Sequence, residues 1–210
     1  MKICATFSSL SYIPIKSYKE EKMTEEKENS FPKLYTRKGD GGITCQYNGI
    51  RTPKSALKVE AVGNLDAAQS YIGVVISTLP PSLACLKAPL LRVEHQFYRL
   101  QCDVAAGREL IGKEDTKELE KEIDEYMGQV EPLRDFILPL GCPTAAKLHF
   151  ARTLVRKAER SCVASNQMGS DPIREEDMAF VNRLSDFLFA MARFANKKEG
   201  VEEIIAKEEK

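Results

Sequence analysis

The chain has 210 residues, of which 43% are hydrophobic and 30% charged, a balance typical of one globular domain with an appendage. Lysine and arginine together number 31, as do aspartate and glutamate, so the formal net charge is zero. This charge argues against a broad nucleic-acid-binding surface, which needs an excess of basic residues. No apolar run is long enough to span a bilayer, and the six cysteines, none at CxxC spacing, are interpreted as reduced thiols.

The first thirty residues differ in composition from the rest. Residues 1–18 contain no acidic side chain, and residues 19–29 form a run of acids and lysines. One interpretation is a disordered, solvated tail. The other is a mitochondrial transit segment, favoured by the missing acids and the hydroxyl residues. We therefore expect a tail over 1–30, a folded domain over 31–200 and a charged C-terminal tail over 201–210.

The stretch 31–53 is rich in glycine and lacks a helical period. From Ala56 onward, apolar residues recur at three- and four-residue steps and predict helices over 57–77, 82–106, 115–130, 143–164 and 175–197. Residues 135–141 are expected to form a short extended loop. The expected fold class is all-α, a five-helix up-and-down bundle.

The fourth predicted helix carries an arginine-rich face. Arg152, Arg156, Glu159 and Arg160 are spaced so that they share one side of the helix, with Lys157 beside them. The plain interpretation is a solvated basic face. The functional interpretation is an anion site, because the neighbouring residues are small and apolar and because arginine binds phosphate oxygens in a bidentate manner.

The glycine-rich loop around Gly39 is a second candidate phosphate site. Its glycines let backbone N–H groups approach an anion, while Thr36, Lys38 and Thr44 add donors and Lys54 follows shortly after. It is not a Walker A loop, because no Gly-Lys-Ser/Thr closes it, and a plain turn remains the alternative.

Two further polar positions lie on predicted helices. Asn182 and Asp186 are one turn apart on the fifth helix, where a polar interhelical network is the plain interpretation. Asp66 interrupts the otherwise apolar first helix and needs a cationic partner.

These motifs occur in an order that resembles the PduO-type ATP:cob(I)alamin adenosyltransferases over residues 33–200. The matching segments are Thr36-Arg37-Lys38-Gly39-Asp40-Gly41-Gly42, Lys54, Gly63-Asn64-Leu65-Asp66, Phe136-Ile137-Leu138-Pro139, Leu148-His149-Phe150-Ala151-Arg152-Thr153, Arg156-Lys157-Ala158-Glu159-Arg160 and Asn182-Arg183-Leu184-Ser185-Asp186-Phe187-Leu188-Phe189. Segments 166–169 and 198–200 are most similar to animal mitochondrial members.

The resemblance implies a homotrimer of ferritin-like five-helix bundles with active sites between neighbouring subunits. It implies an enzyme that transfers the 5′-deoxyadenosyl group of ATP to cob(I)alamin, releasing triphosphate and forming adenosylcobalamin. Magnesium and basic side chains would stabilise the leaving group. The implied nucleotide-binding residues are Thr36, Arg37, Lys38, Gly39, Thr44, Cys45 and Lys54 of one subunit, with Arg156, Lys157, Ala158, Glu159, Arg160 and Asn182 of its neighbour.

The same resemblance implies roles on the corrinoid side. The implied catalytic residues are Asp66, Phe136, Arg152 and Arg156. Asp66 would pair with Arg152 across the subunit interface, and Phe136 would displace the lower axial ligand of cobalt. Because cobalt itself is the nucleophile, no protein nucleophile is needed. No metal site built from protein ligands alone is expected.

The chain departs from the family pattern at Ala67, Gln69, Cys45, Lys157 and Asn48-Gly49. Lys157 keeps the charge of arginine but loses its bidentate geometry. These departures motivate an alternative function, a catalytically weak cobalamin carrier or chaperone that delivers the cofactor to a mutase. A structural bundle without ligands is a third class. The expected location is the mitochondrial matrix, with the cytoplasm as the alternative, and a mutase and a cobalamin reductase are the expected partners.

Overall fold

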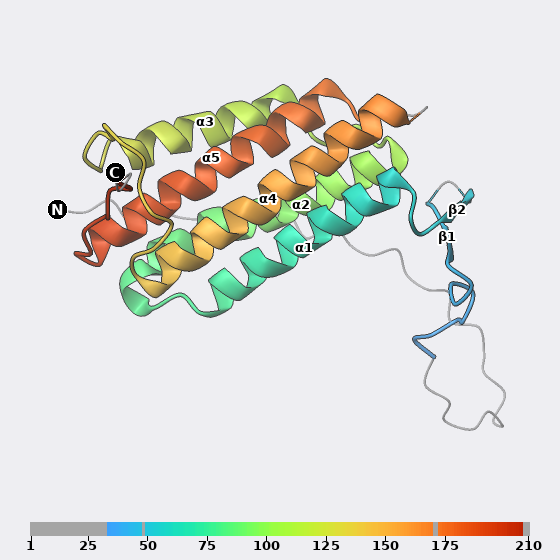
Figure 1. Cartoon of the computed structure of the whole chain (residues 1–210), viewed down its shortest axis with the longest axis horizontal. Coiled ribbons are helices and arrows are strands. Elements are labelled where there is room, and N and C mark those ends of the chain that lie inside the picture. Colours follow the sequence, from blue (N-terminus) through green and yellow to red (C-terminus); the bar gives the residue numbers. More distant parts are fainter. Residues whose placement is uncertain (1–32, 48, 170–171, 208–210) are drawn as a thin grey trace, which may run out of the picture. The chain divides into compact units, whose positions relative to one another are not determined.

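The computed structural model describes residues 33–47, 49–169 and 172–207. Residues up to Arg37 and residues from Lys38 form two separate units, and the second contains the helices. These are α1 (Leu57–Ser77), α2 (Lys87–Ala106), α3 (Lys113–Met127), α4 (Pro143–Met168) and α5 (Glu175–Lys198), with a 3-10 helix, η1 (Pro81–Leu86), before α2. Successive helices run in opposite directions along the bundle, so the expected five-helix arrangement is confirmed (Figure 1).

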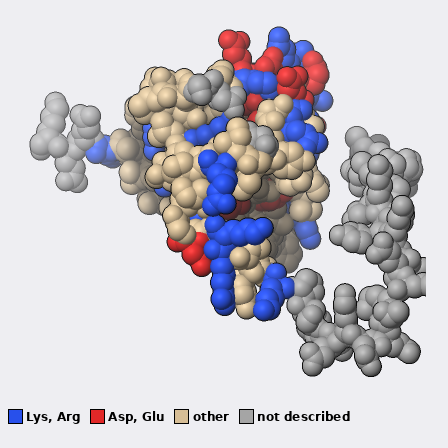
Figure 2. All heavy atoms as spheres, turned by 90° about the vertical axis from the view of Figure 1, so that its right-hand side faces the viewer, with Lys and Arg blue, Asp and Glu red and all other residues tan. Residues whose placement is uncertain are grey.

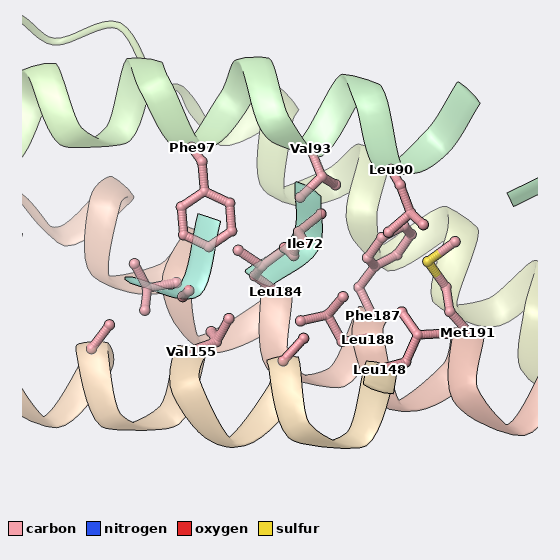
Figure 3. Packing of buried hydrophobic residues seen from close by; sticks show 14 of the residues in the cluster. Ile72, Leu90, Val93, Phe97, Leu148, Val155, Leu184, Phe187, Leu188 and Met191 are labelled. Carbon is pink, nitrogen blue, oxygen red and sulfur yellow. The ribbon is translucent and has the colours of Figure 1, made fainter. Parts of the chain in front are cut away.

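The core lies between the helices and is built from the apolar faces that the sequence predicts. Helix α4 packs against both α1 and α5, α1 also packs against α2, and α5 against α3. Figure 3 shows the side chains that meet in the middle of the bundle, which are Ile72 of α1, Leu90, Val93 and Phe97 of α2, Leu148 and Val155 of α4, and Leu184, Phe187, Leu188 and Met191 of α5. All of them are buried, so their contacts contribute to the hydrophobic stabilisation of the bundle.

Charged pairs join α2 to α3. Arg92 forms ion pairs with Glu118 and Glu122, and Arg99 binds Asp115 with an N–O distance of 2.8 Å. The carboxylate of Asp115 also accepts a 2.9 Å hydrogen bond from the backbone N–H of Gly112, which caps the first turn of α3. This cap explains why α3 begins at residue 113, two residues before the expected start.

The second helix begins later than expected. Residues 82–86, predicted to be α-helical, belong to η1 instead, and Leu83 has non-helical dihedral angles (φ −107°, ψ 18°). Pro89 then lies in the first turn of α2, where its missing N–H group costs no intrahelical hydrogen bond. Helix α4 extends four residues past the expected end at Ala164, and its buried face continues to Ser165.

The glycine-rich segment forms a small antiparallel hairpin that the sequence did not predict. Strand β1 (Ile43–Cys45) pairs with β2 (Arg51–Pro53), and Thr44 lies opposite Thr52. Gly42 and Gly49 have positive φ angles of 76° and 83°, which side chains rarely tolerate. The hairpin leads directly into α1.

The residues after α5 return to the loop between α3 and α4. Ile205 forms an antiparallel bridge with Ile137. Residues 204–206 thus form backbone contacts with residues 136–138. Within the described chain, no helix is both long and apolar enough to cross a membrane. The expected tail over residues 1–30 lies outside the described residues.

Candidate functional site

The glycine-rich loop is folded so that a lysine lies over a glycine. A Cβ atom placed on Gly39 would lie 3.2 Å from Nζ of Lys54, which is tighter than an ordinary contact. The backbone N–H of Gly42 donates to the carbonyl of Gly39 (3.2 Å), and the N–H of Lys54 donates to the carbonyl of Gly42 (2.8 Å). The structure therefore brings together Gly39 and Lys54, which the sequence analysis assigned to one site.

A small hollow of about 200 Å³ lies between the hairpin and the first turns of α1. Thr44 and Cys45 of β1 form one side of it, and Val59 and Val62 of α1 form another. Next to the hollow, the Arg108 guanidinium donates to the hydroxyl of Tyr47 (2.9 Å). Thr44 and Cys45, two expected nucleotide-binding residues, thus border a concave surface. Thr36 and Arg37 are exposed and belong to the first unit.

The basic face of α4 is accessible. Arg156, Lys157 and Arg160 are exposed along the helix. Beside them, Nδ2 of Asn182 on α5 donates a hydrogen bond to Oε1 of Glu159, with a length of 2.7 Å. On the end of the molecule seen in Figure 2, lysine and arginine side chains gather in one region, apart from a mixed acidic and basic region. The arginine-rich face therefore includes a polar contribution from α5.

Ala158 does not fit the expected ligand set. Its side chain is fully buried in the core, on the opposite side of α4 from the basic face. The sequence analysis assigned it to the nucleotide because it lies inside the matching motif. A helical position two residues after Arg156 points elsewhere, so we remove the Ala158 side chain from the candidate site.

A larger hollow, about 720 Å³, lies next to the loop between α3 and α4. Its lining comprises Leu133, Arg134, Asp135, Phe136, Ile137, Arg152, Phe189 and Ala206. The Phe136 side chain is 89% exposed, and the Arg152 guanidinium lies 5.9 Å from the centroid of the Phe189 ring. Burial, and then the nearby charge of Arg156, lower the pKa of Arg152. The structure therefore brings Phe136 and Arg152, two expected catalytic residues, to one concave surface.

Asp66 lies apart from this hollow. It is exposed on α1, and the described part of the chain contains no ion pair between Asp66 and Arg152. The sequence analysis expected that pair between two subunits, so a single chain does not test it.

Sequence reasoning gave no role to His149 and Phe189, which lie beside Arg152. The His149 side chain is 2% exposed, and neither of its ring nitrogens has a hydrogen-bond partner among the described residues. Burial, and then the charge of Arg152, lower the pKa of His149 to about 4, so the imidazole is neutral at neutral pH. Its ring lies 5.8 Å from that of Phe189. Both residues belong to matching motifs. The sequence signals for their place beside Arg152 are that His149 precedes it by three residues on one helix and that Phe189 lies on the facing helix.

The comparisons with known proteins agree on one family. The family model for cobalamin adenosyltransferase matches residues 34–195. A corrinoid adenosyltransferase of Bacillus subtilis is 39% identical over 178 residues, which cover 82% of this chain and 91% of that protein. The corrinoid adenosyltransferase MMAB of Mus musculus is 36% identical over 186 residues, covering 84% and 78%. The chain therefore has the expected similarity to animal members, and its sequence identity to a bacterial member is comparable.

Solved structures show the same fold. A variant of the PduO-type ATP:corrinoid adenosyltransferase from Lactobacillus reuteri, complexed with cobalamin and ATP, superposes with a TM-score of 0.80 at 30% identity, covering 83% of this chain and 97% of that chain. A second variant of the same protein, also complexed with cobalamin and ATP, gives a TM-score of 0.78 at 31% identity, covering 84% and 100%.

Proposed function

The chain belongs to the cobalamin adenosyltransferase family, and from this membership we infer that it is an ATP-dependent transferase that forms adenosylcobalamin. Its substrates are ATP and cob(I)alamin, and its products are adenosylcobalamin and triphosphate. The observation that carries this function is the match over residues 34–195, which spans the hairpin, the basic face of α4 and the loop with Phe136.

The reaction needs little from the protein beyond binding and charge. The electron pair of cobalt(I) attacks the 5′ carbon of ATP, a cobalt–carbon bond forms, and the bond between that carbon and the triphosphate oxygen breaks. The leaving group gains negative charge, so cations placed around it lower the barrier. The exposed side chains of Arg156, Lys157 and Arg160 offer three such cations on one helix.

We propose that ATP binds between two subunits. One subunit supplies Lys38, Gly39, Thr44, Cys45 and Lys54, and the neighbouring α4 and α5 supply Arg156, Lys157, Glu159, Arg160 and Asn182. Thr36 and Arg37 are proposed as further nucleotide ligands on the family match alone. The approach of Lys54 to Gly39 supports this assignment, because it places an ammonium group against a glycine-rich loop, where backbone N–H groups can approach an anion.

Magnesium is proposed to arrive with ATP. The described residues contain no group of three or more His, Cys, Asp or Glu side chains placed to hold a metal. We propose that the ion is held mainly by phosphate oxygens and water, which is a common arrangement for Mg²⁺.

The large hollow is proposed to take the lower face of the corrinoid. Phe136 is proposed to displace the lower axial ligand of cobalt, because its exposed ring projects from the loop that lines the hollow. Arg152 is proposed to pair with Asp66 of a neighbouring subunit. Such a pair would give Arg152, which is half-buried and whose Nε lacks a hydrogen-bond partner in the described chain, the partner it needs.

The proposed assembly is a homotrimer. Exposed apolar side chains on the neighbouring helices α1 and α4, Val74 and Phe150, support a subunit interface on that side of the bundle. Phe150 is 51% exposed although it contacts Tyr71 edge to face, with ring centroids 4.8 Å apart. An apolar surface of this kind favours association.

The mitochondrial matrix is the proposed location, supported by the acid-free composition of residues 1–18. A cobalamin-dependent mutase and a cobalamin reductase are the proposed partners, because the product serves one and the cobalt(I) substrate needs the other. The carrier function is kept as the alternative on the strength of Ala67, Cys45 and Lys157.

Calorimetry with ATP separates the enzyme from the carrier. We expect the purified protein to bind MgATP and, with cob(I)alamin added, to convert the visible spectrum to that of adenosylcobalamin. A protein that binds cobalamin but neither binds ATP nor changes the spectrum would be the carrier.

A further inference from the structure

The segment after α5 holds the backbone of the loop that carries Phe136. The N–H of Ala206 donates to the carbonyl of Phe136, and the N–H of Leu138 donates to the carbonyl of Ile204, each with a length of 2.8 Å. Ile137 forms an antiparallel bridge with Ile205 between these bonds. The segment 201–207 therefore adds a short strand to the loop on both sides of residue 137.

A buried ion pair fixes this segment to the bundle. Arg193 of α5 is 3% exposed, and its Nε lies 3.0 Å from each carboxylate oxygen of Glu203. Its Nη2 donates to Oε2 of Glu203 (2.8 Å) and to the carbonyl of Glu131 (2.7 Å). Several hydrogen bonds from one guanidinium fix the orientation of the two side chains as well as their separation. Arg193 therefore holds α5, the loop after α3 and the C-terminal segment together.

The phenyl ring of Phe136 has little support of its own. It is 89% exposed, so packing does not set its position, and the position must come from the backbone. The far end of the loop is fixed separately, because Asn196 accepts from the N–H of Cys142 (2.9 Å) and donates to the carbonyl of Leu140 (3.2 Å). The C-terminal segment is therefore the contact that holds the part of the loop around Phe136.

We propose that residues 201–207 act as a latch, held by the Arg193–Glu203 pair, that positions Phe136 against the lower face of the corrinoid. Arg193 and Glu203 are thus positioning residues, and Ala206 of the latch lines the same hollow as Phe136. This inference rests on the function proposed above. It predicts that loosening the latch impairs displacement of the lower ligand and spares the transfer step.

The test compares two corrinoids in the full-length protein. Both are supplied as cobalt(II) with a chemical reductant, because cobalt(I) already holds no lower ligand. Cob(II)alamin carries a lower base that must be displaced before reduction, whereas cob(II)inamide lacks that base. The variant Glu203→Gln weakens the ion pair and keeps the side-chain shape. We expect its kcat/KM for cobalamin to fall roughly 10- to 100-fold, because a small misplacement of a group at the active site has an effect of this size. Activity with cobinamide and the affinity for ATP should stay near the wild-type values. Glu202→Gln is the matched control, because Glu202 is an exposed neighbour on the same segment.

A second variant, a chain ending at Gly200, removes the whole latch, including Glu203, and leaves the Arg193 guanidinium bonded to the carbonyl of Glu131. When the lower ligand of cob(II)alamin is displaced, the cobalt becomes four-coordinate, and electron paramagnetic resonance detects this state. With ATP bound, both variants should lose the four-coordinate signal, while their circular dichroism stays unchanged. Equal loss with cobalamin and cobinamide, or no loss with either, would overturn the latch. If the wild-type protein converts neither corrinoid, the proposed function fails instead.

Discussion

Nδ2 of Asn182 on α5 donates a 2.7 Å hydrogen bond to Oε1 of Glu159 on α4. The two residues are far apart in the sequence, and the bond joins the helices that carry the proposed nucleotide-binding face. Because Glu159 lies between Arg156 and Arg160 in sequence, its orientation influences the charge that this face presents. The proposed nucleotide-binding face therefore takes side chains from two helices.

Removing the Asn182 amide should weaken ATP binding. In Asn182→Ala, Glu159 loses its partner, and a bond of this kind contributes about 1 kcal/mol, or roughly fivefold in affinity. Calorimetry with MgATP measures the change. Gln167→Ala, at an exposed polar position near the end of α4, is the control and should bind as the wild type does. An unchanged affinity in Asn182→Ala would mean that the pair lies outside the nucleotide site.

Arg156→Ala should remove most of the turnover. Loss of one preorganised cation from a developing charge costs on the order of 10²–10³-fold in kcat. Since Arg156 is exposed, the free energy of unfolding should change by no more than about 0.5 kcal/mol. Lys121→Ala removes an exposed cation on α3 and is the matched control. Turnover that survives in Arg156→Ala would show that the basic face does not stabilise the triphosphate.

Lys157→Arg should tighten ATP binding. Arginine can bind phosphate oxygens with two parallel hydrogen bonds, whereas lysine offers a point charge. We expect KM for ATP to fall by a factor of about 2 to 10, the effect of one better charge-assisted hydrogen bond. Lys157→Ala should shift KM in the opposite direction. If all three proteins share one KM for ATP, residue 157 does not contact the nucleotide.

The buried His149 predicts a dependence of stability on pH. Its pKa is about 4 in the folded chain, against 6.5 for a free imidazole, and burial is the main cause. Between these values the unfolded chain binds a proton that the folded chain does not. The contribution of the neutral imidazole to the free energy of unfolding is fully present above pH 6.5. It is lost as the pH falls toward 4, by at most about 1.4 kcal/mol per pH unit.

Urea unfolding of the wild type and of His149→Leu at several pH values measures this contribution. The variant should lose less stability between neutral and mildly acidic pH than the wild type. The comparison is needed because burial also raises the pKa of Asp177 to about 6, and protonation of Asp177 favours the folded state as the pH falls. Identical pH profiles for the two proteins would show that His149 is solvated or charged in the folded state.

The helices were predictable because their apolar residues repeat over many turns. Residues 57–77 and 143–168 show this well, since Leu65, Ile72, Leu148 and Val155 all reach the core. Short elements were not predictable. The strands of the hairpin have three residues each, too few for a period, and residues 81–86 begin with a proline, which suits the first turn of either kind of helix.

The site was only partly predictable from physical patterns. Spacing placed Arg156 and Arg160 on one face of a helix, but it could not relate Phe136 to Arg152, which depends on how a loop returns to the bundle. The role of Phe136 came from the family resemblance. The pairing of Arg193 with Glu203 depends on the chain reversing after α5, which the charged composition of residues 201–210 concealed.

The most direct test of the account is the stoichiometry of a single turnover. Protein in excess is mixed with MgATP and cob(I)alamin, and adenosylcobalamin and triphosphate are quantified separately. We predict that the two products form in equal amounts. Release of phosphate or diphosphate in place of triphosphate, or no adenosylcobalamin from folded protein, would contradict transfer from the 5′ carbon of ATP.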